Sequence, residues 1–444
     1  MSEKLVIIGG VAAGTSAAAK ARRVNPDLDI TLYTDDEYIS YAGCGLPYFI
    51  GGKIASREKL LARSVADFAA QNIRVKTLMR AEEINPETEK VVIRNLQTQL
   101  IFEDNYDRLI ITTGARPIVP PLERNNLDGI FTLRTIHDSL RIKAFLSQHR
   151  PQKAVVIGGG YIGLEMVENL IEYGCQITLI EKASHIVPNM DADMAQILTQ
   201  YLESRGVEIR TGETITGFRG NKSVTGIYTD KGEIRADFVL LSIGVQPNSE
   251  IAAAAGIERG IKNAIRVNAK METNKMNIYA AGDCATTSHI VSEKDVYIPM
   301  GTTANKQGRV AGENAGGGNA SFNGVLGTGI ARVMEMEISR TGLCESECQA
   351  LGINYISRRI KSRTAAHYCP VSGEIHLKLI VNQSNNRLIG AQIVGFAGAA
   401  MRIDMLATAI TVGATVEDLI DMDLAYSPPF SPVWDPVLIA LNQF

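Results

Sequence analysis

Two glycine-rich turns contain the residue types that hold the diphosphate of a nucleotide. They lie 149 residues apart, counted from Gly9 to Gly158. In such a turn the backbone amides approach the diphosphate, which then lies at the positive end of the following helix dipole. Two turns therefore predict two bound nucleotides.

The second turn, residues 158–163, fits the full G-x-G-x-x-G pattern. Glu181 follows 23 residues after Gly158, where a carboxylate accepts hydrogen bonds from both ribose hydroxyls and repels a 2'-phosphate. The pattern favours NADH, although the neighbouring Lys182 weakens this preference and leaves NADPH as an alternative. The nucleotide contacts expected in the turn are Gly158, Gly160, Tyr161, Ile162 and Gly163.

The first turn, residues 9–14, keeps its end glycines but has Val11 at the usual middle glycine. Thr34 replaces the acidic residue that is usual after the second strand, so Asp35 or Asp36 is expected to bind the ribose. A lone turn of this kind could be a plain loop, but the matching second copy favours a nucleotide site. Its expected contacts are Gly9, Ala13, Gly14 and Asp35.

Each turn lies between a short apolar strand and a helix, and a second strand follows. Alternating strands and helices at these spacings predict an α/β fold, with parallel sheets joined by right-handed crossovers. The predicted strands are 5–8, 30–33, 154–157 and 176–180, and the predicted helices are 15–24 and 164–173.

The length of 444 residues indicates two to three domains. Short strands and loops are expected over residues 250–283, and a domain boundary is expected near residue 325. A separate C-terminal domain follows that boundary. The remaining predicted elements are a helix over 299–315, a strand over 375–381, a helix over 398–412 and a proline-rich tail over 427–436.

The composition argues against several classes of protein. A net charge of -3 and a pI near 6.1 provide no basic surface for nucleic acid. No run of about 18 apolar residues predicts a membrane span. The N-terminus lacks the pattern of a signal peptide, so a cytoplasmic location is expected. Six cysteines are too few and too scattered for a disulfide framework.

Three further motifs lie at residues 106–114, 237–248 and 278–283. Together with the two turns, they resemble the pyridine nucleotide-disulfide oxidoreductases over essentially the whole chain. The resemblance implies two Rossmann-like domains, for FAD and NAD(P)H, and an α+β dimerisation domain. The implied bounds are 1–120 and 245–325 for FAD, 121–244 for NAD(P)H and 326–444 for dimerisation. Further implied cofactor contacts are Thr113, Gly114, Gly244, Thr303, Ala304 and Asp283, the last on the ribityl and phosphate side of FAD.

Residues 40–48 contain one cysteine, Cys44, where the family usually has a pair separated by four residues. This segment resembles the single-cysteine branch, which contains coenzyme A disulfide reductases, persulfide reductases, NADH oxidases and NADH peroxidases. A lone cysteine implies a mixed disulfide, a persulfide or a sulfenic acid on its sulfur. We expect a lowered pKa for Cys44 because a helix start and the flavin would lie nearby.

Ala12 occupies the position where the peroxidases and many oxidases of the family carry a histidine. This difference favours the coenzyme A disulfide and persulfide reductases. Gly43 and Trp434 replace an asparagine and a lysine that help to hold coenzyme A in family members. The basic residues on the first helix could bind phosphates or form a solvated helix face. The implied substrate contacts are Ser16, Lys20, Arg23, Ser40 and Asn305.

In the family, the tyrosines that correspond to Tyr368 and Tyr426 come from the partner subunit and reach the redox sulfur. The resemblance therefore implies a homodimer with a shared active site. Cys369, beside Tyr368, could approach the cysteine of the other subunit. Cys344 and Cys348 share a helical face but lack the further ligands of a metal site, so they are expected to pack.

The resulting hypothesis is that NAD(P)H reduces coenzyme A disulfide, or a related small disulfide or persulfide, through FAD and Cys44. Tyr161 would gate the nicotinamide side, and the helix start around residues 303–306 would stabilise negative charge on reduced flavin. NADH oxidase or polysulfide reductase activity is the alternative among enzymes. Outside enzymes, the alternative is a flavin-bearing redox sensor that acts through a protein partner.

Overall fold

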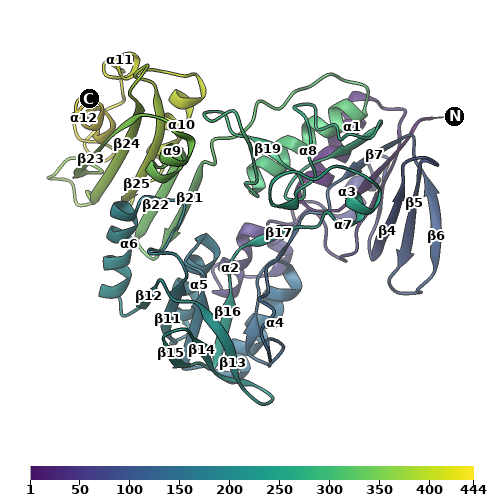
Figure 1. Ribbon diagram of the computed structural model, residues 1–444, viewed down its shortest axis with the longest axis horizontal. Coiled ribbons are helices and arrows are strands. Elements are labelled where there is room, and N and C mark those ends of the chain that lie inside the picture. The colour runs from purple at the N-terminus through teal and green to yellow at the C-terminus, as the bar shows by residue number, and fades with distance from the viewer. Residues whose placement is uncertain (1) are drawn as a thin grey trace.

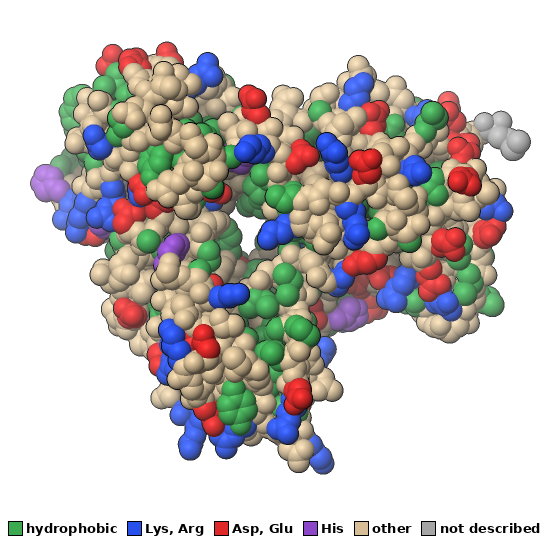
Figure 2. All heavy atoms as spheres, in the orientation of Figure 1, with side chains coloured by type: hydrophobic (Ala, Val, Ile, Leu, Met, Phe, Trp, Pro, Cys, Tyr) green, Lys and Arg blue, Asp and Glu red, His purple; other side chains and the backbone are tan. Residues whose placement is uncertain are grey.

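The computed structural model describes residues 2–444, which form three lobes around a central hollow (Figures 1 and 2). One lobe contains the N-terminus and a five-stranded parallel sheet in the order β18-β7-β1-β2-β3. Its strands are β1 (Lys4–Ile8), β2 (Asp29–Tyr33), β3 (Ile73–Lys76), β7 (Arg108–Ile111) and β18 (Ile278–Ala280). A small antiparallel sheet beside it contains β4 (Met79–Asn85), β5 (Lys90–Asn95) and β6 (Ile101–Asn105).

The second lobe repeats the arrangement with a parallel sheet in the order β12-β11-β10-β16-β9. These strands are β9 (Ile130–Phe131), β10 (Lys153–Ile157), β11 (Gln176–Glu181), β12 (Glu208–Thr211) and β16 (Phe238–Leu241). A three-stranded antiparallel sheet adds β13 (Ile215–Gly220), β14 (Val224–Thr229) and β15 (Gly232–Arg235). The two chain connections to the first lobe pair with each other as β8 (Ala115–Pro117) and β17 (Val245–Pro247).

The C-terminal lobe contains an antiparallel sheet in the order β21-β22-β25-β24-β23 (Figure 1). Its strands are β21 (Gly329–Val333), β22 (Met336–Gly342), β23 (Tyr355–Arg363), β24 (Glu374–Asn382) and β25 (Leu388–Gly395). Outside this sheet, β19 (Thr287–Ser288) and β20 (Asp295–Val296) form a separate two-stranded sheet. Two parallel α/β lobes and one α+β lobe confirm the predicted fold class.

The helices lie mainly beside these sheets. In the first two lobes they are α1 (Ala12–Val24), α2 (Leu46–Ile50), α3 (Val65–Ala69), α4 (Ile136–His149), α5 (Tyr161–Glu172), α6 (Ala192–Ser204), α7 (Glu250–Ala254) and α8 (Gly301–Ala315). In the C-terminal lobe they are α9 (Glu345–Leu351), α10 (Arg402–Thr411), α11 (Val416–Leu419) and α12 (Pro436–Leu441).

The helices α1 and α8 pack unusually closely, although they are far apart in the sequence. A Cβ atom added to Gly308 would lie 2.3 Å from the carbonyl oxygen of Ala13, and one added to Gly312 would lie 2.2 Å from that of Ala17. Glycines on α8 and alanines on α1 therefore allow the two backbones to touch. This packing brings the start of α8 beside the first glycine turn.

Several predicted element ends are wrong by a few residues. Helices α1 and α5 begin three residues earlier than predicted, because the last glycine of each turn is already part of the first helical turn. Helix α8 begins at Gly301, two residues later than predicted. The segment 250–283, predicted as strands and loops, contains the short helix α7, whose alanines support helical structure.

Candidate functional site

The first glycine turn has no room for side chains at its two ends. Gly9 has a φ of +111°, and a Cβ atom added there would lie 2.1 Å from the carbonyl oxygen of Thr112. A Cβ atom on Gly14 would lie 1.9 Å from the carbonyl oxygen of Gly9. The predicted contact Ala13 is buried directly after the start of α1. The turn therefore presents backbone amides, the groups that bind a diphosphate.

The second glycine turn has the same construction. Gly158 has a φ of +106°, and an added Cβ atom would lie 2.4 Å from the carbonyl oxygen of Ser242. A Cβ atom on Gly163 would lie 2.1 Å from the carbonyl oxygen of Gly158, whereas one on Gly160 would meet nothing within 4 Å. Ile162 is exposed beside this open space. Gly160 therefore faces the side from which a nucleotide would approach.

The two turns differ in the residue that follows the second strand. Glu181 accepts hydrogen bonds from the amides of Gly159 and Ala183, both at 2.8 Å. Because each carboxylate oxygen has two lone pairs, acceptor capacity remains for ribose hydroxyls. Lys182, next to it, is exposed.

Thr34 takes the corresponding place in the first turn and is buried against Gly10, whose added Cβ atom would lie 2.9 Å from the Thr34 side chain. Asp35, predicted to bind the ribose, is exposed and its carboxylate lies 3.3 Å from Arg80. Asp35 therefore forms an ion pair with the neighbouring strand β4, whereas Glu181 hydrogen-bonds to its own turn.

A polar cluster lies where the first sheet, the connections between the lobes and α8 meet. The Asp283 carboxylate is 2.7 Å from the guanidinium of Arg134, a residue that the sequence reasoning missed. Asn248 donates a hydrogen bond to the carbonyl of Thr113 at 2.9 Å, and its own amide N–H donates to Gly114 at 2.9 Å. These bonds fix Thr113 and Gly114 beside Asp283.

Within residues 2–444, the helices α1, α5 and α8 each begin without a side-chain cap. Each start leaves N–H groups free for an anion. Of the predicted contacts on α8, Thr303 and Ala304 are buried in its first turn. Gly244 has a φ of +112° on the second connection between the lobes. Uncapped amides next to glycine turns without side chains fit the diphosphates of FAD and NAD(P)H.

Cys44 is an exposed thiol in a single turn, residues 43–45, directly before α2. The amide of Ser40 donates a hydrogen bond to the carbonyl of Gly10 at 2.9 Å, which fixes the segment to the first glycine turn. At the other end of α2, Tyr173 of the second lobe donates to the carbonyl of Ile50 at 2.9 Å. The cysteine is thereby held between the two nucleotide-binding modules.

The protein groups around Cys44 act against the lowered pKa expected from a helix start and a bound flavin. Although Cys44 is exposed in the single chain, nearby protein atoms remove part of the water around its sulfur, which raises the pKa of the thiol, and the carboxylate of Glu165 raises it further. Arg134 acts in the opposite direction but does not compensate. Desolvation is the largest cause of this shift, and the charge of Glu165 is the next.

Glu165 and Tyr48 are two further residues that the sequence reasoning missed. Glu165 lies one turn after Tyr161 on α5, and burial raises its pKa to about 7, partly opposed by the hydroxyl of Tyr48. Burial also raises the pKa of Tyr48. The one sequence signal for Glu165 was its i, i+4 spacing from Tyr161, which puts both side chains on one helix face.

Among the predicted substrate contacts, Ser16 donates a hydrogen bond to the side-chain oxygen of Asn305 at 2.6 Å. Lys20 instead forms an ion pair with Glu313 at 2.8 Å, and Arg23 is exposed at the end of α1. Ser40 has a φ of +48° and is half-buried. The structure therefore brings together Ser16 and Asn305 and leaves Arg23 apart.

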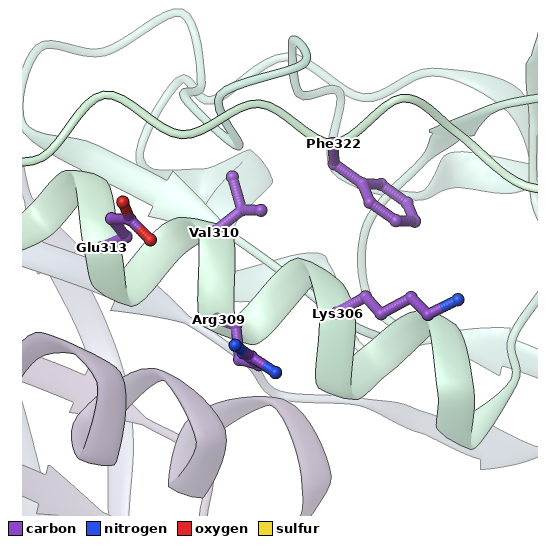
Figure 3. Close-up of a pocket in the computed structure, with 5 residues that line it drawn as sticks. All are labelled: Lys306, Arg309, Val310, Glu313 and Phe322. Atoms are coloured by element: carbon purple, nitrogen blue, oxygen red, sulfur yellow. The ribbon is translucent and has the colours of Figure 1, made fainter.

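A shallow pocket of about 270 Å³ lies on α8 beside these residues (Figure 3). Figure 3 shows Arg309 directed toward the neighbouring helix and Phe322 above Lys306. Neither basic residue forms an ion pair within residues 2–444. The pocket is lined by Lys306, Arg309, Val310, Glu313 and Phe322.

Tyr368 and Tyr426 lie together in the C-terminal lobe. Both are exposed, they line one pocket of about 370 Å³, and a hydrogen bond with Tyr426 raises the pKa of Tyr368. Within residues 2–444, the groups that shift the pKa of Tyr368 are Tyr426 and Cys369, and neither tyrosine is among the groups that shift the pKa of Cys44. One chain therefore contains both halves of the predicted site without joining them.

Cys344 and Cys348 are packed inside the C-terminal lobe, as expected. Cys344 caps α9 and Cys348 lies within it, and both are buried. All six cysteines are free thiols, and residues 2–444 contain no group of three potential metal ligands. A separate observation concerns membranes. In the described part of the chain, every helix is too short or too polar to cross a membrane.

Comparison with known proteins assigns the family. The pyridine nucleotide-disulphide oxidoreductase family matches residues 3–308, and its dimerisation domain matches residues 330–436. The chain belongs to this family. It is therefore an oxidoreductase of a family that uses FAD and NAD(P)H, with a C-terminal dimerisation domain.

Relatives include the NAD(P)H coenzyme A polysulfide/persulfide reductase of Pyrococcus horikoshii, which is 37% identical over 99% of this chain and 98% of its own. The coenzyme A disulfide reductase of Staphylococcus haemolyticus is 34% identical over 96% of each chain. The crystal structure of reduced Bacillus anthracis CoADR-RHD superposes with a TM-score of 0.97 at 37% identity, covering 100% of this chain and 80% of that one.

Proposed function

We propose that this enzyme uses NAD(P)H to reduce coenzyme A disulfide, or a related small disulfide or persulfide, through FAD and the single cysteine Cys44. The observation that carries the proposal is the place of Cys44 between the two nucleotide-binding modules, held at one end by Gly10 and at the other by Tyr173. The names of the Pyrococcus and Staphylococcus relatives support the class of substrate.

The sulfur chemistry balances as follows for a disulfide R–S–S–R. The Cys44 thiolate attacks one sulfur, forms a mixed disulfide and releases one thiolate. Two electrons then break the mixed disulfide, which returns the Cys44 thiolate and releases the second thiolate. With one solvent proton, NADH and R–S–S–R yield NAD⁺ and two R–SH. A persulfide R–S–SH yields R–SH and H₂S by the same route.

FAD, when bound, would supply the redox chemistry that connects the hydride of NAD(P)H to the two-electron reduction of sulfur. The residues that would hold it are those of the first turn, Thr113, Gly114 and Asp283, with Thr303 and Ala304 at the uncapped start of α8. Asp35 would bind its ribose. Arg134, paired with Asp283, also places positive charge beside Cys44.

The second turn would hold NAD(P)H through Gly158, Gly160, Ile162 and Gly163, and Tyr161 would cover the nicotinamide side. Glu181, fixed beside the turn, supports a preference for NADH. The exposed Lys182 could still attract the 2'-phosphate of NADPH.

We propose a homodimer in which Tyr368 and Tyr426 serve the active site of the other subunit. Both are exposed in the C-terminal lobe, and large apolar side chains near them are exposed as well. These are Val371, Met401, Phe430, Val433 and Trp434. A second copy of the chain would cover this apolar surface.

The substrate would lie along α1 and the start of α8, on Ser16, Ser40 and Asn305, with Lys20 and Arg23 near its phosphates. The basic pocket residues Lys306 and Arg309 extend this surface. The family resemblance implies that Gly43 and Trp434 stand at two positions that help to hold coenzyme A in family members, so a smaller disulfide or a persulfide is the second candidate. Six free thiols agree with a reducing cytoplasm.

The test is the anaerobic oxidation of NADH by the flavin-loaded enzyme with coenzyme A disulfide, coenzyme A persulfide, polysulfide and glutathione disulfide. Cys44→Ser should lose about 10³-fold or more in turnover, as expected when a nucleophile is removed. Oxygen uptake as fast as any sulfur reaction would instead indicate an NADH oxidase. Slow turnover with every acceptor would indicate a redox sensor, and full activity of Cys44→Ser would overturn the proposal.

A further inference from the structure

Tyr161, the first residue of α5, is held by contacts that come from outside its own glycine turn. Its hydroxyl accepts a hydrogen bond from the side-chain amide of Asn189 at 3.3 Å. On its other side, Gly329 of β21 leaves the space that the ring occupies. A Cβ atom on Gly329 would lie 2.7 Å from the hydroxyl and 3.1 Å from the ring. The C-terminal lobe therefore forms one wall of the Tyr161 pocket.

The loop that contains Asn189 belongs to the second lobe but is fixed by the C-terminal lobe. Arg340 of β22 donates a hydrogen bond to the carbonyl of Asn189 at 2.6 Å. Two residues later, the amide of Asp191 donates to Gln392 at 2.8 Å, and Lys378 lies 3.0 Å from the Asp191 carboxylate. Side chains from the adjacent strands β22, β25 and β24 thus bind this short loop.

The side chain of Arg340 is buried and held in place by an ion pair. Its side chain is 6% exposed, and its guanidinium is 2.9 Å from the carboxylate of Glu347. Glu347 also accepts a hydrogen bond from the amide of Cys344 at 2.8 Å, which fixes the carboxylate to the start of α9. A buried cation with a fixed partner holds its geometry better than a solvated one.

Strain in the loop adds an independent observation. Val187 has a φ of +50°, a conformation that is rare for a β-branched residue, and it is buried. Its amide donates to the carbonyl of Gly159, in the second glycine turn, at 2.9 Å. Such strain persists only where the surroundings determine the backbone strongly. The loop is therefore tied to the glycine turn at Val187 and to the C-terminal lobe at Asn189.

We propose that Asn189 and Arg340 are positioning residues that hold Tyr161 in its closed place, so that the C-terminal lobe sets the access of the nicotinamide. The Arg340 bond to Asn189 is short and charge-assisted, whereas the Asn189 bond to Tyr161 is long and neutral. Entry of the nicotinamide then breaks only the weaker bond, while Asn189 stays in place. This inference rests on the role proposed above for Tyr161.

The geometry predicts a population shift toward the open position when the weak bond is lost. Asn189→Ala and Tyr161→Phe should each tighten NADH binding by about 2- to 10-fold, the range expected for one neutral hydrogen bond. The double variant should bind no more tightly than either single variant, because both changes remove the same bond. Gly329→Ala, which places a methyl group 2.7 Å from the Tyr161 hydroxyl, should act in the same direction.

The dissociation constant of NADH and the rate of flavin reduction are measured by rapid mixing without any sulfur acceptor, so the result does not depend on the acceptor. Asn221→Ala, an exposed asparagine of the same lobe, is the matched control. Additive effects in the double variant, or unchanged binding in both single variants, would overturn the role of Asn189. Arg340→Met should tighten NADH binding as Asn189→Ala does. A lower melting temperature with unchanged binding would show that Arg340 is only structural.

Discussion

The two glycine turns share one backbone construction but differ in every side chain that could add specificity. Gly9 and Gly158 have nearly the same φ, and in both turns the last glycine lies against the carbonyl of the first. After the second strand, however, one lobe has the buried Thr34 and the other has Glu181 bound to its own turn. We infer that the common backbone serves a diphosphate in both turns, and that the side chains around each turn set which nucleotide it prefers.

The largest effect is expected from a side chain at the first glycine of each turn. Gly9→Ala and Gly158→Ala each combine a backbone strain of about 1–3 kcal/mol with a direct clash against a carbonyl. Gly9→Ala should be purified without flavin, whereas Gly158→Ala should keep its flavin and bind NADH at least about 10-fold more weakly. Flavin absorbance per protein and NADH titration check both. Loss of flavin in both variants would contradict the assignment of FAD to the first turn and of NADH to the second.

A smaller effect is expected at the acidic residue of the second turn. Glu181→Ala should lower the ratio of kcat/KM for NADH over NADPH by about 10- to 100-fold, the value of one hydrogen bond to a charged group. Thr34→Val, the matched change in the first lobe, should leave this ratio unchanged. Steady-state kinetics with both nucleotides measure the ratio. An unchanged ratio in Glu181→Ala would contradict the role of Glu181 in selecting NADH over NADPH.

The helices after the turns provide a pH-dependent contrast, because Glu165 of α5 corresponds in position to Ser16 of α1. Burial raises the pKa of Glu165 from 4.5 to about 7, so the folded chain keeps a proton that the unfolded chain has lost. Its contribution to stability is present below about pH 4.5 and is lost as the pH rises through about 7. Melting temperatures of Glu165→Gln should therefore fall less between pH 5 and pH 8 than those of the parent, within about that window. Ser16→Ala should keep the parental pH dependence.

The smallest effects are expected from the exposed cations beside each module. Arg23→Gln should raise KM for coenzyme A disulfide, and Lys182→Gln should raise KM for NADPH, each by about fivefold or less. Neither variant should affect the other substrate. Both differences should shrink as salt is added, because exposed charges are screened. A change in both constants from either variant would mean that the two surfaces are not separate.

The turns and their strands were predictable because a buried apolar run followed by glycines is a local pattern. The starts of α1 and α5 were not, because the apolar period begins only after the last glycine while the helical backbone begins earlier. Cys44 could be found from its segment, but its pKa is raised by desolvation and by Glu165, which is distant in the sequence, and neither effect is visible in the segment itself.

The parts of the site that no pattern predicted arise from contacts between lobes. Arg134 reaches Asp283 only because the chain connections bring the start of α4 beside the end of β18. Glu165 approaches Tyr48 because α2 of the first lobe packs on α5 of the second. Asp35 had the right type and place for a ribose ligand, yet its ion pair with Arg80 shows how a neighbouring strand competes for such a side chain.

The close packing of α1 on α8 also determines when this protein can become complete during synthesis. The second lobe is continuous from β9 to β16, so all the strands of its parallel sheet have been synthesised before β18 is made. The first lobe is not continuous, because β18 and the glycines Gly308 and Gly312 that receive α1 emerge only after the second lobe has been made. Synthesis of the first lobe therefore starts before that of the second lobe, but the first lobe is completed after it.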